Sequence, residues 1–284
     1  MTPYERLLTV PPSAAFWVAV IAYAAATAAL LFALGGKAKV RPAALALVGL
    51  AFVAHGVDIA WRGTLHVHPA QSVREALGLL AWILTGGYLL ASTRFRLTLG
   101  GVVVMPVSLV LLLLARLTPA GGWPPGTEGA GERWQPGIDL SALGRVHISL
   151  ATIGVGVFAL ASALSAIYLA EDRALRRKKF DGLALGGQGG APLESLDRMS
   201  HRLIWVGFPI FTLALVLGAV WTSRLGESLD RIEYPLALVT WLAFAALLVM
   251  RQIYGWRGRR AAKLTLAGFA AALAVLLVYL MRRM

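Results

Sequence analysis

The sequence predicts an all-α fold, namely a polytopic integral membrane protein with about eight transmembrane helices. Three observations support this fold class. Hydrophobic residues make up 58% of the chain and charged residues only 14%, whereas a soluble domain carries about 25% charged residues. The mean hydropathy is +0.71, and eight apolar runs approach or reach the length of about 20 residues that a helix needs to cross a bilayer. Residues 1–284 are expected to form a single transmembrane domain.

The predicted spans begin with residues 14–34. This run is too long for the roughly 7–15-residue core of a signal peptide, so we expect it to remain as a helix. The sixth span contains Pro209, which removes one backbone hydrogen-bond donor and is expected to kink the helix inside the membrane. The eight spans are predicted at residues 14–34, 42–61, 76–91, 97–114, 143–170, 202–221, 235–250 and 262–281.

The distribution of basic residues predicts the orientation of the spans. Seventeen of the 27 lysines and arginines fall in alternate connections, which the positive-inside rule places in the cytoplasm. Both termini are therefore expected outside, in a bacterial inner (plasma) membrane, and the basic, Gly-rich residues 171–200 are expected to form a cytoplasmic loop. The net charge of +13 is explained by attraction to anionic membrane lipid, so we expect no nucleic-acid partner.

Several chemistries are absent from the sequence. The chain has no cysteine, which excludes disulfides, thiolate catalysis and Cys-ligated metal sites. It has no Ser/His/Asp order, no paired carboxylates and no HExxH motif that would indicate hydrolysis. We therefore expect no enzymatic activity, and any metal chemistry must depend on the five histidines.

Two of the histidines are predicted to lie in the membrane near its outer face. His55 follows residue 42 by 13 positions, or about 20 Å of helix, and His147 begins the fifth span from the outer side. His55, Asp58 and Arg62 share one stripe of the second span, because they are spaced at i, i+3 and i+7.

Polar side chains in such a stripe are expected to face the helix bundle. Two imidazoles from separate helices suit the axial positions of haem iron, and Arg62 suits a propionate or phosphate. Alternatively, His55 hydrogen-bonds Asp58 or a neighbouring helix, and His147 caps its own helix. Sequence spacing leaves both interpretations open.

The other three histidines are not expected to form sites. His66 and His68 belong to an outer connection and are interpreted as solvated loop residues. His201 lies between Arg198 and Arg202 at the inner end of the sixth span. Because neighbouring positive charges disfavour a charged imidazole, we expect a neutral side chain at the membrane interface.

Three long stretches carry a family resemblance. They are RVHISLATIGVGVFALASALSAIYLAEDR at residues 145–173, LDRMSHRLIWVGFPIFTLALVLGAVW at 196–221 and TWLAFAALLVMRQIYGWRGRRAAKLTLAGF at 240–269. Together they resemble the cytochrome c assembly family of membrane proteins, of the CcsA, CcmC and HemX type. Upstream, His55, Arg62, Pro69, Glu75 and the pair Ala81-Trp82 also follow the family pattern.

The resemblance implies haem management at the outer membrane face for attachment to apocytochromes c. His147 falls on the outer histidine that ligates haem in the family. The assembly factors also carry a Trp-rich haem-presenting motif, whereas residues 222–234 here contain no tryptophan, and the histidine that the pattern expects in the seventh span is Val249. Among the family's branches, the chain is therefore most similar to the HemX-like one.

Three functions follow as expectations. The leading one is an accessory in haem handling and cytochrome c biogenesis, with haem held by His147, His55 and Arg62 and with cytochrome c maturation proteins as partners. The alternative is a HemX-like regulatory protein that acts on a cytoplasmic haem-biosynthesis enzyme through the basic inner surface. A small-molecule transporter is less favoured, because no charged residue lies clearly at the middle of a span.

Overall fold

The computed structural model describes residues 13–64, 67–70, 72–94, 97–118, 140–176, 192–225 and 231–281. Within these ranges the chain is helical and contains no strand. Eight helices are long and apolar enough to cross a membrane. The predicted all-α, polytopic membrane fold is confirmed.

The helices extend beyond most of the predicted spans. Only the first helix has the predicted bounds. Most of the others are longer than predicted, because helical hydrogen bonding continues through polar residues where hydropathy falls. The helices are α2 (Ala14–Leu34), α3 (Arg41–Thr64), α4 (Val73–Arg94), α5 (Thr98–Leu117), α6 (Leu140–Arg176), α7 (Leu193–Leu225), α8 (Glu233–Tyr254) and α9 (Arg259–Met281), with a short 3-10 turn, η1 (Ala38–Val40), before α3.

The predicted cytoplasmic loop at residues 171–200 is helical at both ends. Its first residues, up to Arg176, continue α6, and its last residues, from Leu193, begin α7. Residues 177–191 lie outside the described part of the chain. Helix α7 runs without interruption through Pro209.

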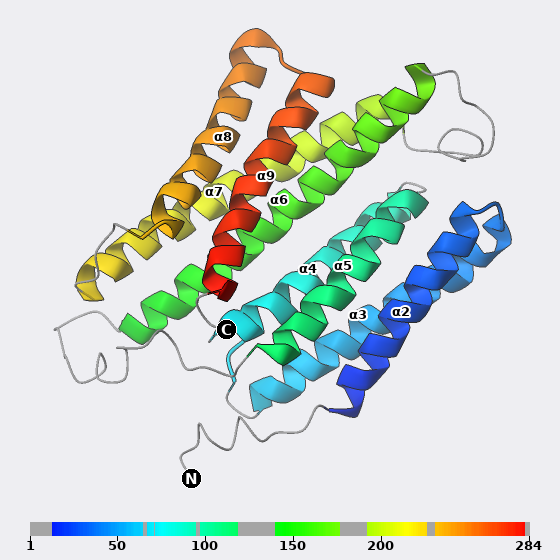
Figure 1. Ribbon diagram of the computed structural model, residues 1–284, viewed down its shortest axis with the longest axis horizontal. Coiled ribbons are helices and arrows are strands. Elements are labelled where there is room, and N and C mark those ends of the chain that lie inside the picture. The colour runs from blue at the N-terminus through cyan, green and yellow to red at the C-terminus, as the bar shows by residue number, and fades with distance from the viewer. Residues whose placement is uncertain are drawn as a thin grey trace.

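The described helices pack in two groups (Figure 1). Helices α2 to α5 form the N-terminal half, and helices α6 to α9 form the C-terminal half. In each half every helix packs against the next one, and the fourth helix also packs against the first. The halves meet mainly where α6 lies against α4. The two halves therefore share one pattern of neighbours.

The helices alternate in direction, which defines two ends of the molecule. We call the lower end the one at which α2 begins and α3 ends, and the upper end the one that holds the α2–α3, α4–α5 and α8–α9 connections (Figure 1). Helix α9 finishes at the lower end, where α2 begins. His55 and His147 both lie in the half of their helices that is nearer the lower end.

Packing inside the halves depends on small and aromatic side chains. Ala19, Ala22 and Ala26 of α2 are buried, as are Ala44 and Ala51 of α3, and small residues allow helices to approach closely where lipid removes the hydrophobic drive to associate. In the C-terminal half the rings of Phe158 and Phe244 stack with centroids 3.7 Å apart. Large apolar side chains such as Trp17 and Leu90 point outward, as expected of a surface covered by lipid.

Candidate functional site

His55 lies inside the N-terminal half, next to a cleft that opens near the lower end. It is nine residues from the end of α3, or about 14 Å, and only 1% of its surface is exposed. Its Nδ1 atom is 3.1 Å from the hydroxyl of Tyr23 on α2. Its Nε2 atom is 3.8 Å from the position that a Cβ would occupy at Gly78 of α4. Because glycine has no side chain, α4 leaves this nitrogen uncovered.

A cleft lies beside His55, with an envelope of about 380 Å³ that includes open solvent. Its polar lining comes from α3 and α4. The lining includes His55, Asp58, Arg62, Arg74 and Glu75. The polar stripe that the sequence predicts on α3 therefore does face the bundle.

Two carboxylates engage Arg62. Its Nε atom is 3.2 Å from Asp58, and its Nη1 atom donates to both oxygens of Glu75 at 3.0 Å. Asp58 also accepts a hydrogen bond from the hydroxyl of Ser13, just before α2, at 2.5 Å. Arg62 thus joins α3 to α4, and any anion that binds it must compete with two carboxylates.

Arg74 is a second guanidinium at the cleft, and sequence reasoning overlooked it. The residue is 7% exposed. Its Nε atom is buried without a hydrogen-bond partner among the described residues, and the nearest carboxylate, of Glu75, is 3.8 Å away. Arg74 is therefore less neutralised than Arg62.

His147 lies in the C-terminal half and contacts α7. Its Nδ1 atom is 2.7 Å from the carbonyl oxygen of Ala214. A carbonyl can only accept, so Nδ1 carries the hydrogen and a neutral ring keeps its lone pair on Nε2. The ring packs against Gly218, where an added Cβ would come within 2.6 Å of the ring. It also stacks on Trp221, with centroids 6.5 Å apart and planes at 16°.

The two candidate iron ligands have different neighbours. His147 is seven residues from the start of α6, or about 10 Å, which is a depth similar to that of His55. The cleft that His55 lines does not include His147 among its lining residues. The structure brings His55, Asp58 and Arg62 together and leaves His147 on the other half. Their role as an axial pair stays a prediction.

Of the two partners expected for His55, Asp58 or a neighbouring helix, the structure shows the second, although the sequence did not indicate which residue. Asp58 was a candidate for its hydrogen bond, but Asp58 instead contacts Arg62 and Ser13, whereas Tyr23 of the neighbouring α2 contacts His55. A tyrosine in the middle of an apolar run was the available signal, since a buried hydroxyl needs a partner. Glu75 forms an ion pair with Arg62, a contact that the sequence did not indicate.

The remaining described histidines have partners of other kinds. His68 accepts a hydrogen bond on Nδ1 from the backbone N–H of Ala70 at 3.1 Å. Partial desolvation, and then the positive charge of Arg145, lower the pKa of His68. The indole N–H of Trp205 donates to His201 at 3.0 Å, in the part of α7 nearer the upper end. His66 lies outside the described residues.

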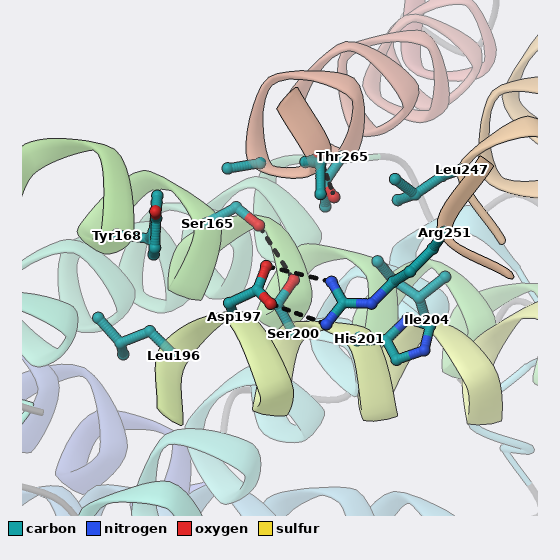
Figure 2. Close-up of a pocket in the computed structure, with 12 residues that line it drawn as sticks. Ser165, Tyr168, Leu196, Asp197, Ser200, His201, Ile204, Leu247, Arg251 and Thr265 are labelled. Carbon is teal, nitrogen blue, oxygen red and sulfur yellow. Dashed lines mark hydrogen bonds and ion pairs between the residues drawn. The ribbon is translucent and has the colours of Figure 1, made fainter. Parts of the chain in front are cut away.

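A second pocket, at the upper end, lies among polar contacts that connect neighbouring helices (Figure 2). Arg251 of α8 donates through both terminal nitrogens to Asp197 of α7, at 3.1 and 2.7 Å. Asp197 also accepts from the backbone N–H of Gly258, at 3.0 Å, just before α9. Ser200 donates to the carbonyl of Ala161 at 3.0 Å. These polar groups satisfy one another and connect α6, α7, α8 and α9.

Comparisons with known proteins identify the family. Residues 71–284 match the model of the family described as cytochrome C assembly protein. The chain is 28% identical over 242 residues to the cytochrome c biogenesis protein CcsA of Synechococcus elongatus, covering 71% of this chain and 72% of that protein.

Two further CcsA proteins show similar agreement. The protein of Gloeobacter violaceus is 28% identical over 260 residues, covering 74% of this chain and 75% of that protein. That of Chlamydomonas reinhardtii is 29% identical over 219 residues, covering 74% and 57%. No solved structure matches this chain. The family match covers α4 to α9, including His147, and it shows that this chain is a member of the cytochrome c assembly protein family.

Proposed function

We propose that this protein takes part in cytochrome c biogenesis by handling haem at the lower end of the molecule, with His147 and His55 as candidate iron ligands and Arg62 as a candidate propionate partner. The excess of Lys and Arg in the upper connections supports a lower end that faces outward from the plasma membrane. The Trp-free residues 222–234 support a place in the HemX-like branch, alongside cytochrome c maturation proteins. The function includes no covalent step by this chain.

The observation that carries this function is the way both rings are held. A histidine that ligates a metal usually donates its other ring N–H to a carbonyl, carboxylate or similar acceptor, which orients the ring. His147 has its Nδ1 on the Ala214 carbonyl, and His55 has its Nδ1 on the Tyr23 hydroxyl. In each ring Nε2 is the nitrogen left for a ligand.

The side chains around the two histidines are of the types that bind haem in proteins. Haem iron takes neutral imidazole as an axial ligand, and its propionates pair with guanidinium groups. Arg62 and Arg74 both line the cleft beside His55, and Trp221 provides an aromatic face beside His147. His55 would thus have two guanidinium groups near it, and His147 an aromatic partner.

The absorption spectrum of the protein purified in detergent, with and without added haem, tests this function. We expect a Soret band in the wild type that shifts or weakens in His147→Ala and His55→Ala and is lost in the double variant. His201→Ala is the matched control, because His201 is in the part of α7 nearer the upper end, and its spectrum should match the wild type. A missing Soret band, or one that the double variant retains, would overturn the function.

The regulatory alternative has one supporting observation, the concentration of basic residues at the upper end. Much of that charge is already paired in the described part of the chain. Arg251 binds Asp197, Arg176 and Arg259 both bind Asp172, and Arg198 binds Glu194. If the alternative is right, changing Arg176, Arg177, Lys178 and Lys179 to Gln should lower recovery of a haem-biosynthesis enzyme with the inserted protein.

A further inference from the structure

A chain of buried hydrogen bonds links His55 to the centre of the N-terminal half. Each of the four helices contributes one member, and the four side chains are at most 1% exposed. The hydroxyl of Tyr23 on α2 is 3.1 Å from His55 Nδ1 and 2.9 Å from the hydroxyl of Thr85 on α4. Thr85 is in turn 3.1 Å from the hydroxyl of Ser108 on α5.

The far end of this chain has a fixed direction. Thr85 donates to the carbonyl oxygen of Ala81 at 2.9 Å or to Ser108, and Ser108 donates to the same carbonyl at 3.3 Å. A carbonyl oxygen has no hydrogen to give. The chain therefore ends on an acceptor, so its hydrogens point away from His55.

The number of hydroxyl hydrogens in the chain determines which atom donates in the bond between Tyr23 and His55. Each hydroxyl has a single hydrogen. If Thr85 gives its hydrogen to Ala81 or Ser108, only Tyr23 can supply the hydrogen between Tyr23 and Thr85. Tyr23 then has none left for His55, so the hydrogen between Tyr23 and His55 must be on Nδ1.

We propose that Tyr23 and Thr85 are positioning residues that hold His55 in the tautomer with hydrogen on Nδ1, so that the Nε2 lone pair faces the cleft beside Gly78. In this tautomer His55 offers a Lewis base to an electron-accepting metal centre. The identity of that centre as haem iron rests on the function proposed above, whereas the tautomer does not.

The opposite direction makes fewer hydrogen bonds. If Tyr23 donated to His55, Thr85 would have to donate to Tyr23 and would lose its bonds to Ala81 and Ser108. The ring would then carry its hydrogen on Nε2, facing Gly78, which has no side chain to accept it. Because this direction gives up the bonds that Thr85 donates to Ala81 and Ser108, the direction that ends on Ala81 is favoured.

Nitrogen NMR of the purified protein with ¹⁵N-labelled histidine tests the tautomer without haem. The His55 signals are assigned by their loss in His55→Gln. We expect a protonated Nδ1 and an unprotonated Nε2 in the wild type. Hydrogen on Nε2, or on both nitrogens, would overturn the inference.

Substitutions at Thr85 and Ser108, whose described hydrogen bonds go to residues other than His55, sharpen the test. Thr85→Val removes the acceptor for Tyr23, so Tyr23 is released to donate to His55 and the hydrogen should move to Nε2. Ser108→Ala is the matched control, because Thr85 still reaches the Ala81 carbonyl, and the tautomer should stay as in the wild type. A folded Thr85→Val variant that retains hydrogen on Nδ1 would overturn the inference.

A haem titration of the same variants separates this inference from the proposed function. If His55 ligates haem, Thr85→Val should weaken haem binding by roughly tenfold, the lower limit for loss of a ligand-orienting partner, whereas Ser108→Ala should not. A tautomer that moves in Thr85→Val without any change in haem binding supports the positioning role and removes His55 from the proposed haem site.

Discussion

His55 and His147 are held through the same ring nitrogen but by different parts of the protein. The Nδ1 of His147 contacts a backbone carbonyl of α7, whereas the Nδ1 of His55 contacts the Tyr23 side chain, which depends on Thr85 and Ser108. Side-chain substitution cannot remove the first partner, but it can remove the second. The ring of His147 is therefore set by how closely α6 and α7 approach, and the ring of His55 by polar side chains on four helices.

The two histidines also differ in their relation to the family. His147 lies within residues 71–284, which match the family model, whereas His55, Asp58 and Arg62 precede that range. Glu75, which pairs with Arg62, and Thr85, which hydrogen-bonds Tyr23, lie inside it. The His55 cleft thus joins α3, outside the family match, to α4, the first helix within it.

The largest effect is expected at the close contact of His147 with α7. Gly218→Ala places a Cβ about 2.6 Å from the ring, so either the ring or α7 must shift. We expect a loss of about 2–3 kcal/mol in stability, as for other overpacked cores, together with loss of any His147-dependent Soret band. Thermal unfolding in detergent, followed by tryptophan fluorescence, measures the first effect.

Gly49→Ala is the matched control for that variant. A Cβ at Gly49 of α3 would meet nothing within 4 Å, and alanine favours a helix over glycine. Its midpoint temperature should equal or exceed that of the wild type. Equal midpoints for Gly218→Ala and the wild type would show that the α6–α7 contact does not hold the ring.

The next effect concerns the ion pairs beside His55. Arg62→Met leaves Asp58 and Glu75 facing each other without their shared cation. We expect a loss of roughly 2 kcal/mol, which is below the 3–5 kcal/mol of a fully buried pair, because the Arg62 side chain is 19% exposed. The same unfolding measurement should show partial recovery in Arg62→Met combined with Glu75→Gln. No recovery would mean that packing, not charge, accounts for the loss.

A smaller effect is expected for the hydrogen-bond chain itself. Tyr23→Phe keeps the buried ring but removes the hydroxyl that contacts His55 and Thr85. Leaving buried polar groups without this partner should cost about 1–2 kcal/mol. Tyr254→Phe is a suitable control, because Tyr254 is 66% exposed and its hydroxyl can bond to water or lipid. A Tyr23→Phe variant as stable as this control would rule out an energetic role for the chain.

The smallest effect is the pH dependence of His68, whose Nδ1 accepts a hydrogen bond instead of donating one. Desolvation, and then Arg145, lower its pKa in the folded protein, so the unfolded chain takes up a proton first as the pH falls. The stability contribution is therefore complete above about pH 6.5 and is lost below it. Unfolding midpoints between about pH 7.5 and pH 5 should fall less in His68→Gln than in the wild type. Parallel pH profiles would contradict this.

Sequence reasoning succeeded where a property is local. The number of spans followed from apolar runs of sufficient length, and the i, i+3, i+7 spacing correctly placed His55, Asp58 and Arg62 on one face that lines a cleft. It failed where partners come from distant segments. Tyr23 and Thr85 are 62 residues apart, and hydropathy carries no information about which faces of α2 and α4 meet.

The sequence by itself determined the fold class and the family, and it indicated that His55 and His147 lie at similar depths in their helices, because hydropathy and helical rise depend only on residues along one segment. The tertiary structure decided which groups those histidines contact. It assigned His55 to Tyr23 and His147 to the Ala214 carbonyl, and it placed the two rings on separate halves. Hydrogen bonds of this kind depend on distance and angle between atoms on different helices, and only the packed arrangement of α2 to α9 supplies those.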